Sequence, residues 1–173
     1  KENNVVLHGL AGTGKTFISL YLALNELFKP KSYKDKVVIV RSVVPTREMG
    51  FLPGSEKEKM KTYEAPYQSM CNDLFGRGDA YEILKTKKQI EFMSTSFLRG
   101  TTLDDCIILV DEAQNLTFHE LDSIITRVGV NSQILFCGDC NQTDLDKPWD
   151  QCGLDPFMTI LDNITTFKKV EFS

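Results

Sequence analysis

The chain alternates short apolar runs with longer stretches in which apolar residues recur at helical spacing. The short runs predict strands near residues 5–7, 37–40, 90–93, 106–110, 133–137 and 167–172. The longer stretches predict helices over about 15–28, 55–75, 79–88, 117–128 and 154–161. Uninterrupted apolar strands are typical of sheets covered on both faces, and strands that alternate with helices pair in parallel. We therefore predict an α/β fold in a single domain, with a mainly parallel sheet flanked by helices.

Capping and helix-breaking residues refine this pattern. Ser55 and Thr117 each precede a predicted helix and have a glutamate three residues later, which predicts a capping box at both helix starts. Pro66 lies inside the helix predicted over 55–75 and predicts a break or a kink there. Residues 41–54 form a long connection, and long ordered loops are commonly functional.

Residues 9–16 carry the clearest chemical signal. They read Gly-Leu-Ala-Gly-Thr-Gly-Lys-Thr and match G-x-x-x-x-G-K-[ST], the phosphate-binding loop of nucleoside triphosphatases. A predicted strand precedes them and a predicted helix follows, so loop N–H groups and the helix dipole can hold an anion. The alternative is a glycine-rich turn between strand and helix in which the lysine and threonine occur by chance.

This motif predicts the roles of its last two residues. Lys15 can reach the β- and γ-phosphates, and the Thr16 hydroxyl can ligate Mg²⁺. The residues that we assign to nucleotide binding from the motif are Gly9, Leu10, Ala11, Gly12, Thr13, Gly14, Lys15 and Thr16.

A pair of carboxylates, Asp111 and Glu112, follows the predicted strand at 106–110. In a triphosphatase, Asp111 would hold Mg²⁺ through water while Glu112 polarises the attacking water. Taken alone, the pair also fits an acidic helix N-cap after a strand. The phosphate loop upstream favours the catalytic interpretation. The glutamate favours hydrolysis over phosphate transfer to a small molecule, because a kinase need not activate water.

Residues 138–142 read Gly-Asp-Cys-Asn-Gln and follow the next predicted strand. Because ligands of open α/β sheets bind at the carboxyl ends of strands, Gln142 is a candidate sensor of the γ-phosphate. A polar turn is the alternative. Residues 141–144 depart from the guanine-reading N-K-x-D motif, since glutamine stands where that motif has lysine. The assignments are Lys15, Glu112 and Gln142 to catalysis, and Thr16 and Asp111 to the metal.

Composition indicates the cellular compartment in which the protein works. No apolar run approaches the roughly 20 residues of a membrane span, so we expect no membrane partner. The five cysteines are odd in number and lie mostly in apolar surroundings, which is typical of reduced thiols. With no leader-like segment visible, these features favour the cytoplasm.

A net charge of −4 gives no global attraction for nucleic acid, so such a contact needs a local basic face. The loop after the second predicted strand offers charge and an aromatic ring for base stacking. Packing of Phe51 inward, in an Ω-like loop, is an equal alternative. The residues that would form this surface are Arg41, Arg47, Phe51 and Pro53.

Read in order, the motifs resemble the PhoH family of phosphate-starvation-inducible ATPases. Beside the phosphate loop and its preceding histidine at 8–16, the resemblance rests on four stretches. These are Gly-Phe-Leu-Pro-Gly at 50–54, Phe-Leu-Arg-Gly-Thr-Thr-Leu at 97–103, Val-Asp-Glu-Ala-Gln-Asn at 110–115 and Gly-Asp-Cys-Asn-Gln-Thr-Asp-Leu at 138–145. The phosphate loop alone is unspecific, and the stretches at 50–54 and 97–103 make the resemblance specific. The shortness of the sequence is similar to phage-encoded members.

The resemblance implies a RecA-like P-loop NTPase core related to the first domain of superfamily 1 helicases. It further implies Mg²⁺-dependent ATP hydrolysis and RNA binding or unwinding. The choice of ATP over GTP rests on the family resemblance alone. It makes Arg99 a candidate cofactor-binding residue that contacts phosphate, RNA or a coupling element, against the alternative of a solvated surface arginine. Family members often have Arg-Pro after the second strand, whereas here three residues separate Arg41 from Pro45.

We expect no second helicase domain within residues 1–173, so an arginine finger would come from a neighbouring subunit. This favours a homo-oligomer such as a ring, and we expect residues 1–173 to be a fragment or minimal core. The predicted function is an ATPase coupled to single-stranded RNA or another nucleic acid. A nucleotide-gated binding module with little turnover is the alternative. A P-loop kinase is a further one, which would need an acceptor pocket and lid arginines.

Overall fold

The computed structural model describes residues 4–43, 56–98, 100–139 and 153–172, and in these ranges six strands form one sheet. Each pair of neighbouring strands is parallel, and the strand order is β3-β2-β4-β5-β1-β6. The strands are β1 Asn4–Gly9, β2 Lys36–Arg41, β3 Ile90–Ser94, β4 Cys106–Asp111, β5 Gln133–Gly138 and β6 Phe167–Phe172. The prediction of a parallel α/β sheet is confirmed.

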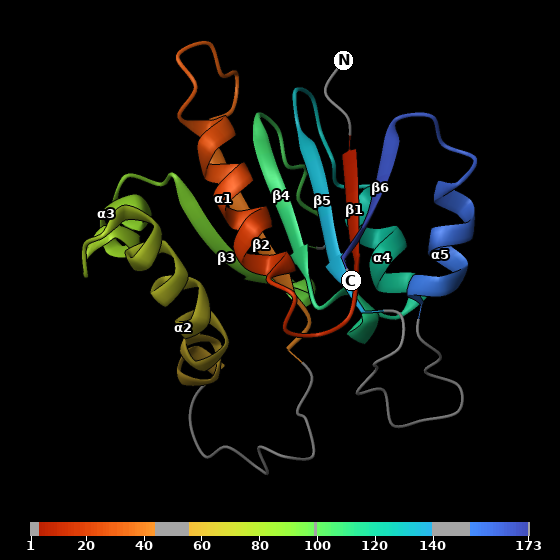
Figure 1. Cartoon of the computed structure of the whole chain (residues 1–173), viewed down its shortest axis with the longest axis horizontal. Helices are drawn as coiled ribbons and strands as arrows, with labels where there is room; N and C mark the ends of the chain where they lie inside the picture. Colours follow the sequence, from red (N-terminus) through yellow and green to blue (C-terminus); the bar gives the residue numbers. More distant parts are fainter. Residues whose placement is uncertain (1–3, 44–55, 99, 140–152, 173) are drawn as a thin grey trace.

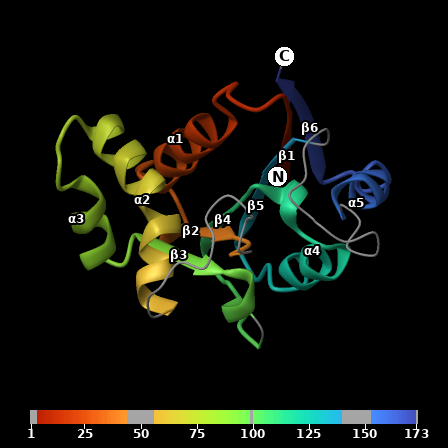
Figure 2. The same cartoon turned by 90° about the horizontal axis from the view of Figure 1, so that it is seen from below.

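Helices cover both faces of this sheet (Figures 1 and 2). One face packs against α1 Lys15–Leu27, α2 Glu56–Phe75 and α3 Ala80–Thr86, and the other against α4 Phe118–Ile125 and α5 Leu154–Leu161. Short 3-10 turns, η2 Thr95–Leu98 and η3 Ala113–Asn115, follow β3 and β4.

Successive residues of the central strand β4 belong alternately to two different hydrophobic cores. Ile107 and Leu109 join the core under α1, α2 and α3, whereas Ile108 and Val110 join the core under α4 and α5. All six residues of β4 are buried. A strand buried on both faces has no polar side, which explains why this run is uninterruptedly apolar.

Of the break or kink predicted at Pro66, the break does not occur, because helix α2 runs through this residue. The proline removes one backbone hydrogen bond, a cost of about 3 kcal/mol in a helix interior. Pro66 is exposed, while Tyr63, Tyr67 and Cys71 of the same helix are buried. Burying three such side chains stabilises the helix by more than the proline costs, at about 1.5–3 kcal/mol for each large apolar side chain.

The capping box predicted at Thr117 is confirmed. The Thr117 hydroxyl accepts from the Glu120 N–H, and the Glu120 carboxylate accepts from the Thr117 N–H at 2.9 Å. Helix α4 ends at Ile125, earlier than predicted, because the chain turns there and Val128 forms a bridge with Leu103. The second predicted cap, Ser55, lies outside the described residues.

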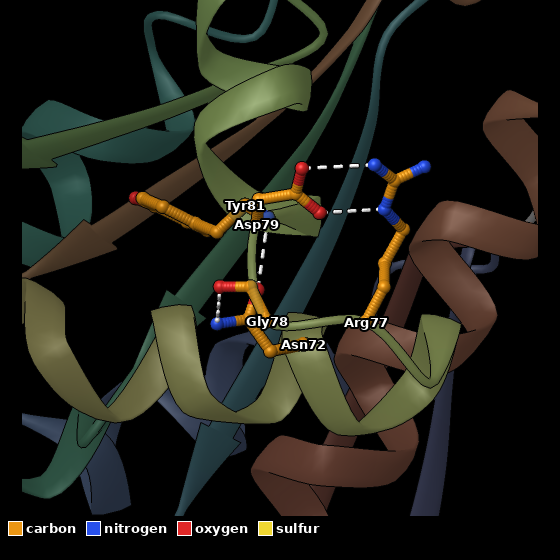
Figure 3. Close-up of polar contacts among 5 residues, drawn as sticks. All are labelled: Asn72, Arg77, Gly78, Asp79 and Tyr81. Atoms are coloured by element: carbon orange, nitrogen blue, oxygen red, sulfur yellow. Dashed lines mark hydrogen bonds and ion pairs between the residues drawn. The ribbon is translucent and has the colours of Figure 1, made fainter.

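The corner between α2 and α3 is held by one amide side chain (Figure 3). The Asn72 side chain accepts from the Tyr81 N–H at 3.1 Å and donates to the Gly78 carbonyl at 2.9 Å. Arg77 and Asp79 pair through two hydrogen bonds on the exposed outside of the turn. The corner fastens α3 to α2, and so fixes the helix pair that covers β2 and β3.

Within the described ranges, no helix combines the length and the apolar character that a membrane crossing requires.

Candidate active site

The loop between β1 and α1 lies at the edge of the sheet where the strands end (Figure 1). Gly14 precedes α1 with a φ of 83°, in the left-handed region that glycine adopts without strain. A Cβ at Gly9 would stand 1.9 Å from the Phe172 carbonyl oxygen of β6, so only glycine fits beside that strand. Backbone conformation and close packing therefore both require glycines at this loop.

Lys15 is buried, and its ammonium group lies inside the curl of the loop. It donates to the Gly9 carbonyl at 2.7 Å and to the Leu10 carbonyl at 2.5 Å. The charge is therefore held at the centre of the loop, where an anionic phosphate would be neutralised.

The next residue, Thr16, meets a carboxylate 95 residues further along the chain. Its hydroxyl donates to Asp111 Oδ1 at 2.7 Å, where β4 ends. A hydroxyl beside a carboxylate offers the hard oxygen ligands that Mg²⁺ prefers, with phosphate oxygens and water completing the shell. The residues present therefore fit a magnesium ion.

A residue that the sequence analysis missed completes this contact. Tyr67 of α2 donates its phenol hydrogen to Asp111 Oδ2 at 2.6 Å. Burial, reinforced by the charge of Asp111, raises the pKa of Tyr67 well above its ordinary value, so the phenol keeps its proton. No local pattern distinguishes this tyrosine from a core residue of α2.

Glu112 follows Asp111 in an unusual backbone conformation. Its φ of 52° and ψ of 43° are left-handed, which costs a residue other than glycine about 1–3 kcal/mol. The conformation turns the chain out of β4 and into η3. The Glu112 carboxylate then accepts a hydrogen bond from the side-chain amide of Gln114.

Gln114 connects this glutamate to the end of β5. Its side-chain oxygen accepts from the Asp139 N–H at 3.1 Å. The Asp139 carboxylate in turn accepts from the Ala11 N–H of the phosphate loop at 3.0 Å. Gly138 leaves room at this point, since a Cβ there would lie 2.8 Å from Leu154 Cδ2 and 3.2 Å from the Gln114 oxygen. A chain of contacts thus joins β4, β5 and the loop.

These residues surround one cavity of about 340 Å³. It lies within the size range of ligand pockets, and its lining mixes loop residues, carboxylates and apolar side chains. The lining residues are Ala11, Gly12, Gly14, Lys15, Thr16, Phe17, Met70, Asp111, Glu112, Gln114, Cys137, Gly138 and Asp139.

The sequence model of the PhoH family, described as "PhoH-like protein", matches residues 1–173. The chain belongs to the PhoH family. A PhoH-like protein of Bacillus subtilis is 37% identical over 149 residues, which cover 85% of this chain and 46% of that protein. Protein PhoH2 of the same organism is 38% identical over 144 residues, covering 81% of this chain and 32% of that protein. The chain therefore spans less than half the length of either relative.

The fold also resembles that of a solved protein, the large terminase from a thermophilic bacteriophage. Its TM-score is 0.58 at 10% sequence identity, covering 100% of this PhoH chain and 41% of the terminase chain. A structure of the same terminase in complex with ADP gives a TM-score of 0.56, covering 99% and 40% of the two chains. The predicted P-loop NTPase fold is confirmed.

The structure brings together the predicted phosphate loop, Lys15, Thr16, Asp111 and Glu112. Two predicted site residues, Arg99 and Gln142, lie outside the described residues. Arg47, Phe51 and Pro53 of the predicted nucleic-acid surface lie outside them as well.

Arg41 is the one residue of that surface within the described ranges, and it faces the site. Its guanidinium lies 5.6 Å from the centre of the Tyr63 ring. Burial opposes its charge, but interaction with Tyr67 and with the carboxylates of Asp111 and Glu112 raises the pKa of Arg41 overall. Arg41 therefore lies among the residues around Asp111.

Proposed function

We propose that this chain is a Mg²⁺-dependent ATPase that couples hydrolysis to single-stranded RNA or another nucleic acid. The observation that carries the proposal is the contact between Thr16 and Asp111. It joins the phosphate loop to the second acidic motif at one cavity, with Lys15 and Glu112 lining the same space. That is the set of groups that phosphate transfer to water requires.

In the proposed reaction, a water oxygen attacks the γ-phosphorus in line with the bond to the β–γ bridging oxygen. Glu112 orients this water and takes its proton as the bridging bond breaks, so the products are ADP and inorganic phosphate. Lys15 neutralises charge on the transferred phosphoryl group. Thr16 and Asp111 would hold the Mg²⁺, which supplies further charge neutralisation when bound.

Gln142 and Arg99 extend this proposal beyond the described residues. We assign Gln142, which follows β5, to sensing loss of the γ-phosphate, and Arg99, which follows η2, to a phosphate or a coupling contact. The same proposal includes a homo-oligomer, in which a neighbouring subunit supplies an arginine finger, and a cytoplasmic location. The complex of the phage terminase with ADP supports nucleotide binding by this fold.

The decisive experiment is an ATPase assay with and without single-stranded RNA or DNA. We expect nucleic acid to stimulate turnover, and Lys15→Ala to lower kcat by about 100-fold or more, because one main group on the developing charge is removed. The exposed residue Lys87, at the end of α3, gives the matched control, and Lys87→Ala should hydrolyse ATP like the wild type.

Other results would identify the alternatives. Binding of nucleotide without turnover, with Glu112→Gln unchanged from the wild type, would indicate a nucleotide-gated binding module. A phosphorylated acceptor in place of free phosphate would indicate a kinase. Turnover that persists in Lys15→Ala would contradict the proposal.

A further inference from the structure

Two donors from two different helices hold the two oxygens of Asp111. The Thr16 hydroxyl of α1 donates to Oδ1 at 2.7 Å, and the Tyr67 hydroxyl of α2 donates to Oδ2 at 2.6 Å. Asp111 is 4% exposed and Tyr67 is fully buried, so water has little access to either group. Because both oxygens are occupied, the carboxylate plane cannot rotate without breaking one of the two bonds.

Tyr67 is itself held in place by its surroundings. Its ring packs against Phe92 of β3, with 5.6 Å between the ring centres. Arg41, which pairs with Asp111 across β2 and β4, interacts with the phenol. The hydroxyl position is therefore determined by α2 and by the sheet together.

We propose that Tyr67 is a positioning residue for the metal site. Its hydroxyl fixes the carboxylate of Asp111 so that Oδ1 is presented beside Thr16. The two side chains would hold a magnesium ion there, Asp111 through water. The inference rests on the proposed role of Asp111 as a metal-site residue. It adds that α2, which lies outside the phosphate loop and its helix, determines how tightly the metal is held.

A purely structural role would have a different signature. A phenol that only satisfies a buried carboxylate would contribute to the free energy of unfolding and leave metal affinity unchanged. A phenol that orients a metal ligand changes the metal affinity, since partners of metal ligands typically contribute about 10- to 100-fold to affinity or activity. The dependence on Mg²⁺ concentration therefore separates the two roles.

The test is a Mg²⁺ titration of Tyr67→Phe, which removes one oxygen atom and keeps the ring. We expect the Mg²⁺ concentration at half-maximal ATP turnover to rise by about tenfold or more. Binding of a fluorescent ADP analogue in excess EDTA should stay within about twofold of the wild type, because the phosphate loop is untouched.

Tyr81→Phe is the matched control. Tyr81 is also buried and also donates to a carboxylate, that of Glu64, at 2.7 Å in the α2–α3 pair. The same atom is removed, but away from the site. We expect this variant to lose stability and to keep the wild-type Mg²⁺ dependence.

A second replacement keeps the inference testable if the Tyr67→Phe variant does not fold. p-Aminophenylalanine at position 67 keeps an N–H donor at the place of the hydroxyl, and should restore a Mg²⁺ dependence close to that of the wild type. If Tyr67→Phe folds and keeps the wild-type Mg²⁺ dependence, the role of Tyr67 is overturned while the proposed function stands. The same holds if the p-aminophenylalanine protein loses Mg²⁺ affinity. Wild-type protein that binds and hydrolyses ATP without needing Mg²⁺ would overturn the proposed metal site, and the inference with it.

Discussion

Gln114 touches both the glutamate proposed to activate water and the end of the neighbouring strand. Its amide donates to Glu112 and its oxygen accepts from the Asp139 N–H. The Gln114 side chain and its bond to the Asp139 N–H are buried, and a buried group that loses its partner costs about 1–3 kcal/mol; the bond to Glu112 is partly buried. The orientation of the Glu112 carboxylate therefore depends on a residue that need not touch the nucleotide.

Gln114→Leu tests this dependence. The variant keeps the approximate volume but removes the amide, so Glu112 loses the donor that orients it. We expect kcat to fall by at least about tenfold, because general-base catalysis depends on correct placement of the base, while the Kd for ADP stays within about twofold. Steady-state ATPase kinetics and ADP titration measure the two quantities.

The control is Gln89→Leu, between α3 and the start of β3, at the opposite edge of the sheet. It should leave kcat unchanged. Equal activity of Gln114→Leu and the wild type would contradict the assigned role.

At the scale of elements, α2 combines an unfavourable residue with favourable packing. The exposed residue Pro66 interrupts the hydrogen bonding of the helix, while Tyr63, Tyr67 and Cys71 are buried in the core. The helix therefore owes its continuity to packing more than to local propensity.

Pro66→Ala should increase the free energy of unfolding by about 1–2 kcal/mol. The gain is the better helix propensity of alanine, reduced by the greater entropy of the unfolded chain. Urea denaturation followed by circular dichroism measures it. Pro30→Ala, in the turn after α1, is the control and should give no gain. A loss of stability in Pro66→Ala would mean that the ring itself shapes α2 for the core.

Elements were more predictable than the contacts among them. The strands at 37–40 and 106–110 follow from apolar runs, and Thr117 with Glu120 marks a helix start, because these signals are local. The contacts of Tyr67 and Gln114 have no local signal. Tyr67 reads as one more apolar position of α2, and its partner is 44 residues away. The phosphate loop and its contact with Asp111 were predictable because the motif carries its own geometry and strand ends meet at one edge.

The left-handed Glu112 shows why a site can depart from local preference. Glutamate disfavours a φ of 52°, so no propensity predicts it. The Gln114 contact and the turn into η3 accompany the conformation, and both depend on the packed sheet. A conformation of this kind can therefore be recognised only once the tertiary structure is known.

At the scale of the whole molecule, the site joins segments that lie far apart in the chain. The loop after β1 contacts Asp139 at the end of β5, and Thr16 contacts Asp111 at the end of β4. A ligand bound to all three segments would oppose unfolding of the entire sheet, because it binds the folded state alone.

MgADP should therefore stabilise the protein against heat. At a concentration about a hundredfold above its Kd, ADP contributes about 2.7 kcal/mol, which corresponds to a rise in Tm of about 5–10 °C for a chain of this size. Thermal denaturation with and without MgADP measures the shift. Lys15→Ala should lose most of it, and Lys87→Ala should retain it. An equal shift in all three proteins would contradict nucleotide binding at the loop.

The place of β1 in the sheet has a consequence for the order of events during synthesis. Among the strands of this sheet β1 is made first, yet it pairs with β5 and β6, up to Phe172 opposite Gly9. At about 5–20 residues per second, a ribosome needs roughly ten to thirty seconds to reach those strands after β1. During that interval the phosphate loop has no neighbouring strands to hold it. The nascent chain should therefore acquire nucleotide binding only when β6 has left the ribosome, although the residues that define the loop are translated well before it.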